Sequence, residues 1–118
     1  MQASSGELVR IGELEIRPHE GLALVRGRAL TLSVREFDLL VALAANAGRI
    51  VSRDELYRLA WGRPLREGDR SCDVYIHKLR AKLERALPGT SFIHTHVGFG
   101  YRLDPQLSHS FHTATTGR

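Results

Sequence analysis

The strongest constraint on the fold is an apolar stripe between residues 71 and 87. Five apolar residues follow one another at steps of four, three, four and four: Cys72, Ile76, Leu79, Leu83 and Leu87. This spacing is typical of one continuous side of an α-helix. It predicts a third helix from about Ser71 to Leu87 that buries the stripe against other helices. The opposite side of the helix is then displayed.

The displayed side of this predicted helix is basic. From Arg70 to Lys82 the chain has four Lys or Arg residues and one Asp, a formal charge of +3. Seven residues lie on or beside it: Ser71, Val74, Tyr75, His77, Lys78, Ala81 and Lys82. Charge runs are usually only a solvated face of a helix. The elements before and after the helix therefore decide between a solvated face and a binding surface.

Two shorter helices are predicted ahead of the stripe, each from a capping box. In Ser33-Val34-Arg35-Glu36 and in Ser52-Arg53-Asp54-Glu55, a Ser hydroxyl and a Glu carboxylate can satisfy free backbone N–H groups at a helix start. The first helix should end at Gly48, and its apolar residues recur at helical spacing: Phe37, Leu40, Val41, Leu43 and Ala44. The second has a shorter apolar side: Leu56, Leu59 and Ala60.

Strands are predicted on both sides of the helices. From Leu8 to Leu32 short apolar runs are cut by turn residues, which indicates an antiparallel sheet of three or four strands. Residues 62–70, GRPLREGDR, read as an exposed loop, and IHTHVGFGYRL from Ile93 to Leu103 reads as two strands joined by a glycine turn. This order is that of an α+β winged helix-turn-helix with an N-terminal antiparallel sheet, three helices and a C-terminal β-hairpin wing. In such folds the third helix enters the DNA major groove.

Length and composition favour one intracellular domain. The 118 residues suffice for one core, and 17 Lys or Arg against 13 Asp or Glu favour a polyanionic partner. The single cysteine, Cys72, excludes an internal disulfide and a CxxC metal cage. No stretch approaches the roughly 20 apolar residues of a membrane helix. We expect a soluble, cytoplasmic domain over residues 7–104, with disordered ends over residues 1–6 and 105–118.

The string from Leu30 to Leu103 resembles the OmpR/PhoB-type winged-helix domain, the output module of bacterial two-component response regulators. Six motifs stand in that family's order and spacing: Leu-Thr-x-x-x-x-Glu-Phe, Gly-Arg-Ile-Val-Ser-Arg, Ala-Trp-Gly, Arg-x-x-Asp-Val, Leu-Arg-x-Lys-Leu and Gly-x-Gly-Tyr. The resemblance implies a sequence-specific, double-stranded DNA-binding domain of a transcriptional regulator in a phosphorelay. Its recognition helix would be residues 71–87, approximately, and its wing about 92–103. Relatives usually also carry an N-terminal receiver domain with a phosphorylated aspartate.

By this resemblance, ten positions meet DNA. Those at the recognition helix are Arg70, Ser71, Val74, Tyr75, His77, Lys78 and Arg80. Lys78 and Arg80 can neutralise phosphates or reach guanine O6 and N7, while Val74 and Tyr75 can meet a thymine methyl or a sugar. Three more positions match donors to the phosphate backbone: Trp61, Thr95 and Tyr101. For Trp61 and Tyr101, core packing is the alternative.

The resemblance also implies partners besides DNA and one departure from the family pattern. The loop over residues 62–69 matches the segment that relatives use to contact RNA polymerase, and two copies would bind two half-sites as a tandem homodimer. Relatives commonly place an arginine directly before the wing's Gly-x-Gly and insert it into the minor groove, whereas this chain has Val97. The wing should therefore contribute less charge, with Phe99 as an apolar contact in its place.

Three other interpretations compete with DNA binding. His94 and His96 would project to one face of a strand, as paired metal ligands do, but no second pair of ligands accompanies them, and a partly buried, hydrogen-bonded His96 is the alternative. The Gly98-Phe99-Gly100 turn lacks the third glycine of a phosphate loop, and no catalytic constellation is present. We therefore expect no enzyme, no cofactor and no metal. A winged helix that binds a protein or RNA remains the rival function.

Overall fold

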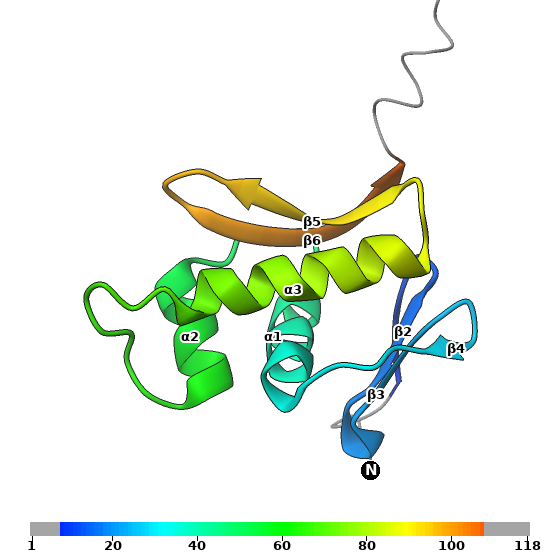
Figure 1. The fold of residues 1–118 in the computed structure, drawn as a ribbon, viewed down its shortest axis with the longest axis horizontal. Helices are drawn as coiled ribbons and strands as arrows, with labels where there is room; N and C mark the ends of the chain where they lie inside the picture. The colour runs from blue at the N-terminus through cyan, green and yellow to red at the C-terminus, as the bar shows by residue number, and fades with distance from the viewer. Residues whose placement is uncertain (1–7, 108–118) are drawn as a thin grey trace, which may run out of the picture.

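The computed structural model describes residues 8–107, which form two small antiparallel sheets around three helices (Figure 1). The first sheet has the order β1-β2-β3-β4: β1 (Val9–Ile11), β2 (Leu14–Arg17), β3 (Leu22–Val25) and β4 (Arg28–Ala29), with a 3-10 turn, η1 (Pro18–Glu20), between β2 and β3. The helices are α1 (Val34–Ala45), α2 (Arg53–Trp61) and α3 (Ser71–Ala86). The closing hairpin is β5 (Thr90–His96) and β6 (Gly100–Leu107). The predicted α+β winged helix-turn-helix is confirmed.

The predicted ends of the domain need one correction. Residues 1–6 and 108–118, which we expected to be disordered, lie outside the described residues. Residues 105–107 do not belong with them, because β6 continues to Leu107. Its last residues pair with the start of β5, Ser91 opposite Gln106 and Thr90 opposite Leu107. In residues 8–107, no helix is both long enough and apolar enough to span a bilayer.

Both predicted Ser caps start their helices, but only the first forms the full capping box. The Ser33 hydroxyl accepts from the Glu36 N–H at 3.2 Å, and the Glu36 carboxylate accepts from the Ser33 N–H at 2.9 Å. At α2 the Ser52 hydroxyl accepts from the Glu55 N–H at 3.1 Å, while the Glu55 carboxylate lies 3.0 Å from Arg58. The second box is therefore half formed.

The apolar stripe of α3 is confirmed as the centre of the core. All five of its side chains are buried: Cys72, Ile76, Leu79, Leu83 and Leu87. They face α1, α2 and β5, against which α3 packs. Burial of a side chain of this size contributes roughly 1.5–3 kcal/mol, so the orientation of α3 about its own axis is fixed. On α2 one prediction is wrong: Leu59 is 52% exposed, and Tyr57 occupies the core in its place.

The turn between α1 and α2 joins the wing through an isolated β-bridge. Val51 exchanges both backbone hydrogen bonds with Tyr101, at 2.8 and 2.9 Å, and the Gly48 N–H donates to the Leu103 carbonyl at 2.9 Å. The wing backbone can approach this turn so closely only because residue 100 is glycine. Gly100 has a φ of +146°, and a Cβ there would lie 2.1 Å from the Val51 carbonyl oxygen. The wing is thus fastened to the helix-turn-helix at its base.

An ion pair between a buried carboxylate and a partly exposed lysine connects α3 to the start of α1. Lys82 lies 2.7 Å from the carboxylate of Glu36, which is only 2% exposed, and also donates to the Thr31 carbonyl at 2.9 Å. Burial disfavours the charged form of Glu36, but hydrogen bonds from Lys82 and from Ser33 outweigh it and hold the pKa of Glu36 below its ordinary value. The carboxylate therefore stabilises the fold only while it is ionised.

Replacing Lys82 with methionine is expected to shift acid unfolding to higher pH. Because the Glu36 pKa is lowered in the folded state, its contribution is present above the unfolded pKa and is lost as pH falls through the folded pKa. Without Lys82 the buried carboxylate loses its main partner, at a cost of about 1–2 kcal/mol near neutral pH, since the ammonium is about one third exposed. Circular dichroism during acid titration measures the midpoint. Arg85→Met removes one exposed charge from the same helix, and equal midpoints for the two variants would contradict the role of the pair.

Candidate nucleic-acid interface

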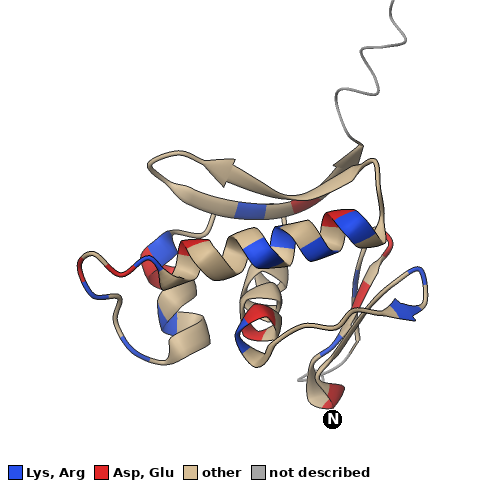
Figure 2. Ribbon diagram, in the orientation of Figure 1, with Lys and Arg blue, Asp and Glu red and all other residues tan. Residues whose placement is uncertain are grey.

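The side of α3 opposite the stripe is open to solvent and carries cations (Figure 2). We define the exposed α3 face as Arg70, Ser71, Val74, Tyr75, His77 and Lys78. Most of its side chains are accessible to solvent: Arg70, His77 and Lys78 are exposed, and Val74 is 48% exposed. Within residues 8–107, neither Arg70 nor Lys78 has an acidic ion-pair partner. Their charges are therefore free to meet an anion.

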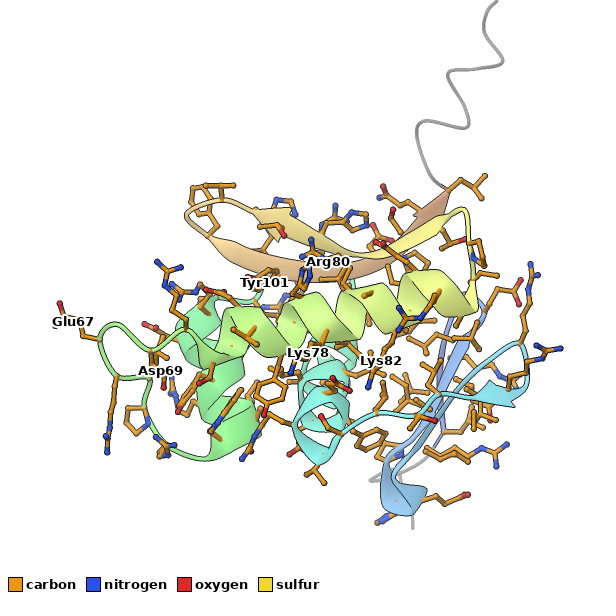
Figure 3. All side chains as sticks on the ribbon, viewed as in Figure 1. Glu67, Asp69, Lys78, Arg80, Lys82 and Tyr101 are labelled. Carbon is orange, nitrogen blue, oxygen red and sulfur yellow. The ribbon has the colours of Figure 1, made fainter. Side chains whose placement is uncertain are left out.

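Two further cations of α3, Arg80 and Lys82, are already engaged within the fold, as Figure 3 shows for their labelled side chains. Lys82 points towards α1 and is neutralised by Glu36, so it does not belong to the displayed charge counted from the sequence. Arg80 lies between α3 and the wing, where its guanidinium donates to the Thr95 hydroxyl at 2.7 Å. Its Nε is buried and has no hydrogen-bond partner among the described residues. Arg80 and Thr95 therefore form one unit at the junction of helix and wing.

Asp73 links the start of α3 to both α2 and the wing. Its carboxylate accepts from the Tyr101 hydroxyl at 2.6 Å and from Arg53 at 3.1 Å. Burial, followed by the Asp73 carboxylate, raises the pKa of Tyr101 well above its ordinary value, so the phenol keeps the proton that it donates. Tyr101 is only 8% exposed, and its hydroxyl points to Asp73. This geometry favours the packing alternative for Tyr101.

Sequence reasoning missed Arg53 and Asp73. Both lie inside motifs that were recognised, and opposite charges at the first turns of two helices were the signal that could have found them. Asp69 was missed as well: its carboxylate accepts from the Ser71 N–H at 2.8 Å and so starts α3, where Arg70 as N-cap makes no side-chain bond. The hydrogen bonds from Ser71 lower the pKa of Asp69. These acids hold the helix in place.

Trp61 supports the exposed α3 face from beneath. Its ring stacks on Tyr57 with centroids 4.3 Å apart and meets the edge of Tyr75 at 5.9 Å. The guanidinium of Arg35 lies over the Trp61 ring at 4.6 Å, and the ammonium of Lys78 lies 5.4 Å from the Tyr75 ring. The packing alternative therefore accounts for most of the Trp61 side chain, and this cluster limits where Tyr75 and Lys78 can move.

The two wing histidines are bound to other groups of the hairpin. The His94 Nε2 donates to the Asp104 carbonyl at 2.7 Å, and the His96 Nε2 accepts from the Arg102 Nε at 3.1 Å. His96 is thus partly buried and hydrogen-bonded, which is the arrangement expected if it is not a metal ligand. Residues 8–107 hold no group of three or more His, Cys, Asp or Glu side chains arranged for a metal ion.

A groove of about 670 Å³ runs between the loop before α3 and the wing. Arg53 and Arg70 line it from the helix starts, Val97 from the wing, and residues 65–69 from the loop. Residues 62–69 are mostly exposed, as predicted, with Leu65 and Asp69 partly covered. The groove adjoins the exposed α3 face at Arg70, so helix, loop and wing make one continuous surface.

Comparison with known proteins assigns this architecture. Residues 27–103 match the family described as "Transcriptional regulatory protein, C terminal". The chain is 39% identical over 103 residues to the transcriptional regulatory protein PrrA of Mycobacterium tuberculosis, covering 87% of this chain and 44% of PrrA. It is 37% identical over 101 residues to the regulatory protein SphR of Synechococcus elongatus, covering 86% of this chain and 39% of SphR. The chain thus spans less than half the length of these relatives.

Solved structures agree with the sequence match. The DNA-binding domain of CpxR from E. coli superposes with a TM-score of 0.74 at 32% identity, covering 82% of this chain and 95% of that one. The DNA-binding domain of RstA from Klebsiella pneumoniae, solved in complex with the RstA box, superposes with a TM-score of 0.74 at 34% identity, covering 83% and 97%. The whole winged helix, and not one motif, is therefore shared.

Proposed function

Because this chain belongs to the family of C-terminal domains of transcriptional regulatory proteins, of OmpR/PhoB type, we propose that it binds double-stranded DNA sequence-specifically. In this proposal α3 enters the major groove, and the wing lies over the adjacent backbone. The observation that supports it is that Arg70 and Lys78 have no acidic ion-pair partner among residues 8–107. They lie on the face of α3 whose opposite side is buried in the core. A fixed helix with free charges can present side chains to base edges in one register.

The ten positions that the family resemblance assigns to DNA contact differ in which of their side-chain groups remain free to bind DNA. Lys78 has a free ammonium for guanine O6 and N7 or a phosphate, and Val74 offers an apolar surface to a thymine methyl. Arg70, Ser71 and His77 border this pair and suit phosphates and sugars. Arg80 and Thr95 would meet the backbone as a unit, since each already orients the other. Tyr75, Trp61 and Tyr101 would act mainly by supporting these side chains.

We propose two further partners on narrower grounds. The exposed loop over residues 62–69 would contact RNA polymerase when the domain is bound upstream of a promoter, and two copies would occupy adjacent half-sites as a tandem homodimer. The domain would act in the cytoplasm at the output end of a two-component system. The support for these proposals is family membership, together with the exposure of the loop.

Selection from random duplexes tests the DNA-binding proposal. Duplexes bound by the domain are enriched, sequenced and footprinted, and affinity for the winner is then measured across salt concentrations. We expect log affinity to fall with log salt by about one unit per phosphate contact. Enrichment of no common sequence, or an affinity that stays constant from about 50 to 200 mM salt, would contradict it. Better competition by single-stranded RNA than by duplex DNA would instead support the rival function.

A further inference from the structure

We propose that the wing tip is an apolar wedge that opens a base step of the bound duplex. The wedge consists of Val97 and Phe99, which flank Gly98 at the end of the β5–β6 hairpin. This inference rests on the proposed function, since it takes duplex DNA as the ligand. It adds that the wing distinguishes DNA sequences by how easily a base step unstacks. The electrostatic potential of the minor groove would not be what the wing recognises.

Both wedge side chains are displayed without a role in the fold. Val97 is 88% exposed and Phe99 73% exposed, the first being the most exposed large apolar residue in residues 8–107. The turn between them is closed by a hydrogen bond from the Phe99 N–H to the His96 carbonyl at 2.8 Å, and Gly98 takes φ +83°. A closed turn holds two apolar side chains at its end, so little backbone conformational entropy remains to be lost on insertion.

The base of the wing is stiff enough to support a wedge. Val51 pairs with Tyr101 on the far side of β6, and Gly100 lets the two backbones approach closely. The Tyr101 hydroxyl is in turn held by Asp73 of α3. The wing is therefore anchored to the core of the helix-turn-helix at its base, so that the tip can be pressed into DNA without the hairpin bending away.

The position of the tip favours DNA over a protein partner. Val97 lines the same groove as Arg53 and Arg70, and Phe99 lines an adjoining crevice of about 290 Å³ at the start of α2. The wedge is thus continuous with the surface proposed to face the duplex. Two side chains are far too little for a stable protein–protein interface, which buries roughly 1,200 Å² or more. They are enough to enter one base step.

The chemistry of the wedge sets the DNA that it prefers. An arginine at a wing tip is attracted by the negative potential of a narrow A·T-rich minor groove, whereas Val97 and Phe99 carry no charge. Apolar side chains that bind the minor groove instead insert between stacked bases and kink the duplex. Pyrimidine–purine steps, TA and CA/TG, unstack at the lowest cost. We therefore expect such a step beside the major-groove contacts of α3.

The test uses the selected duplex with 2-aminopurine placed in turn at each purine of the flank on the wing side. Unstacking raises the fluorescence of this base analogue. We expect wild-type protein to brighten one position, at a pyrimidine–purine step, and Phe99→Ala to abolish the signal. Leu107→Ala, an equally exposed apolar residue at the other end of the same hairpin, is the matched control and should leave the signal intact.

A double-mutant comparison separates the wedge from general loss of folding. Reversing the step to purine–pyrimidine should lower wild-type affinity by about tenfold, but should change the affinity of Phe99→Ala little. Suppose that wild-type protein binds a duplex and that Lys78→Ala weakens this binding. If no 2-aminopurine position then brightens, or if wild type and Phe99→Ala lose the same affinity on the reversed step, the wedge proposal is wrong and the DNA-binding proposal stands. If Phe99→Ala changes only self-association, the tip is a protein contact and the wedge is wrong. If no duplex is bound at all, both proposals fail.

Discussion

Replacing Gly100 with alanine is expected to lower the free energy of unfolding by about 3 kcal/mol or more. The φ of +146° is disfavoured for any residue with a Cβ, and the added methyl carbon would lie 2.1 Å from the Val51 carbonyl oxygen and 2.8 Å from the Ser52 Cα. Both neighbours are backbone atoms, so neither can rotate away. The wing must separate from the α1–α2 turn, and the two hydrogen bonds between Val51 and Tyr101 are then lost.

Thermal unfolding followed by circular dichroism measures this effect, with a drop in Tm on the order of 10 °C or more. Gly98→Ala is the matched control within the same wing, because Gly98 also has a positive φ, +83°, but no atom lies within 4 Å of the position of its Cβ. Only the backbone strain remains there, about 1 kcal/mol. If the two variants unfolded at the same temperature, close packing at the base of the wing would not be what holds it.

Replacing Arg70, Tyr75 and Lys78 together with alanine is expected to reduce affinity for the selected duplex by about 100-fold or more. Two free cations and the ring that positions one of them are removed, while the buried stripe of α3 is untouched. Lys78→Ala alone should cost about 1–3 kcal/mol if Lys78 reads a base, and less, with a shallower salt slope, if it touches a phosphate.

The matched control removes the same two charges elsewhere. Arg28 and Arg85 are exposed, one on β4 and one near the end of α3, and the double variant Arg28→Ala/Arg85→Ala changes net charge equally. Fluorescence anisotropy with the labelled duplex measures all the variants at one salt concentration. The triple variant must lose far more affinity than the control. Equal losses would mean that the domain senses only net charge, and unchanged affinity would remove α3 from the interface.

Periodicity and capping chemistry carried the prediction of the helices, because both depend on local spacing. The α3 stripe is buried in full, and Ser33 and Ser52 cap the helices they were expected to start. Leu59 was misassigned because a nine-residue helix has several apolar sides that fit a core equally well, and tertiary contacts chose Tyr57. The sequence placed the end of β6 at Leu103, four residues early, because residues 104–107 lack a strong strand pattern of their own and are ordered by pairing with the start of β5.

The site was less accessible to sequence reasoning, because its charges pair across elements. Lys82 looked like part of the displayed charge, yet its partner, Glu36, lies 46 positions earlier in the chain. Tyr101 matches a phosphate donor in sequence, yet its hydroxyl donates a hydrogen bond to Asp73, 28 positions earlier in the chain. The spacing of residues on one helix shows which side chains share a face. It does not show which of their charges remain free.

Directed cleavage of DNA from α3 tests the central claim most directly. The only cysteine, Cys72, is fully buried, and burial raises its pKa to about 11, so it stays unlabelled at neutral pH. An iron–EDTA reagent attached through His77→Cys should then cut the selected duplex within one helical turn of the half-site, while the same reagent attached through Glu20→Cys, on the turn between β2 and β3, should not. Cleavage from both positions alike, or from Glu20→Cys alone, would contradict the placement of α3 in the major groove.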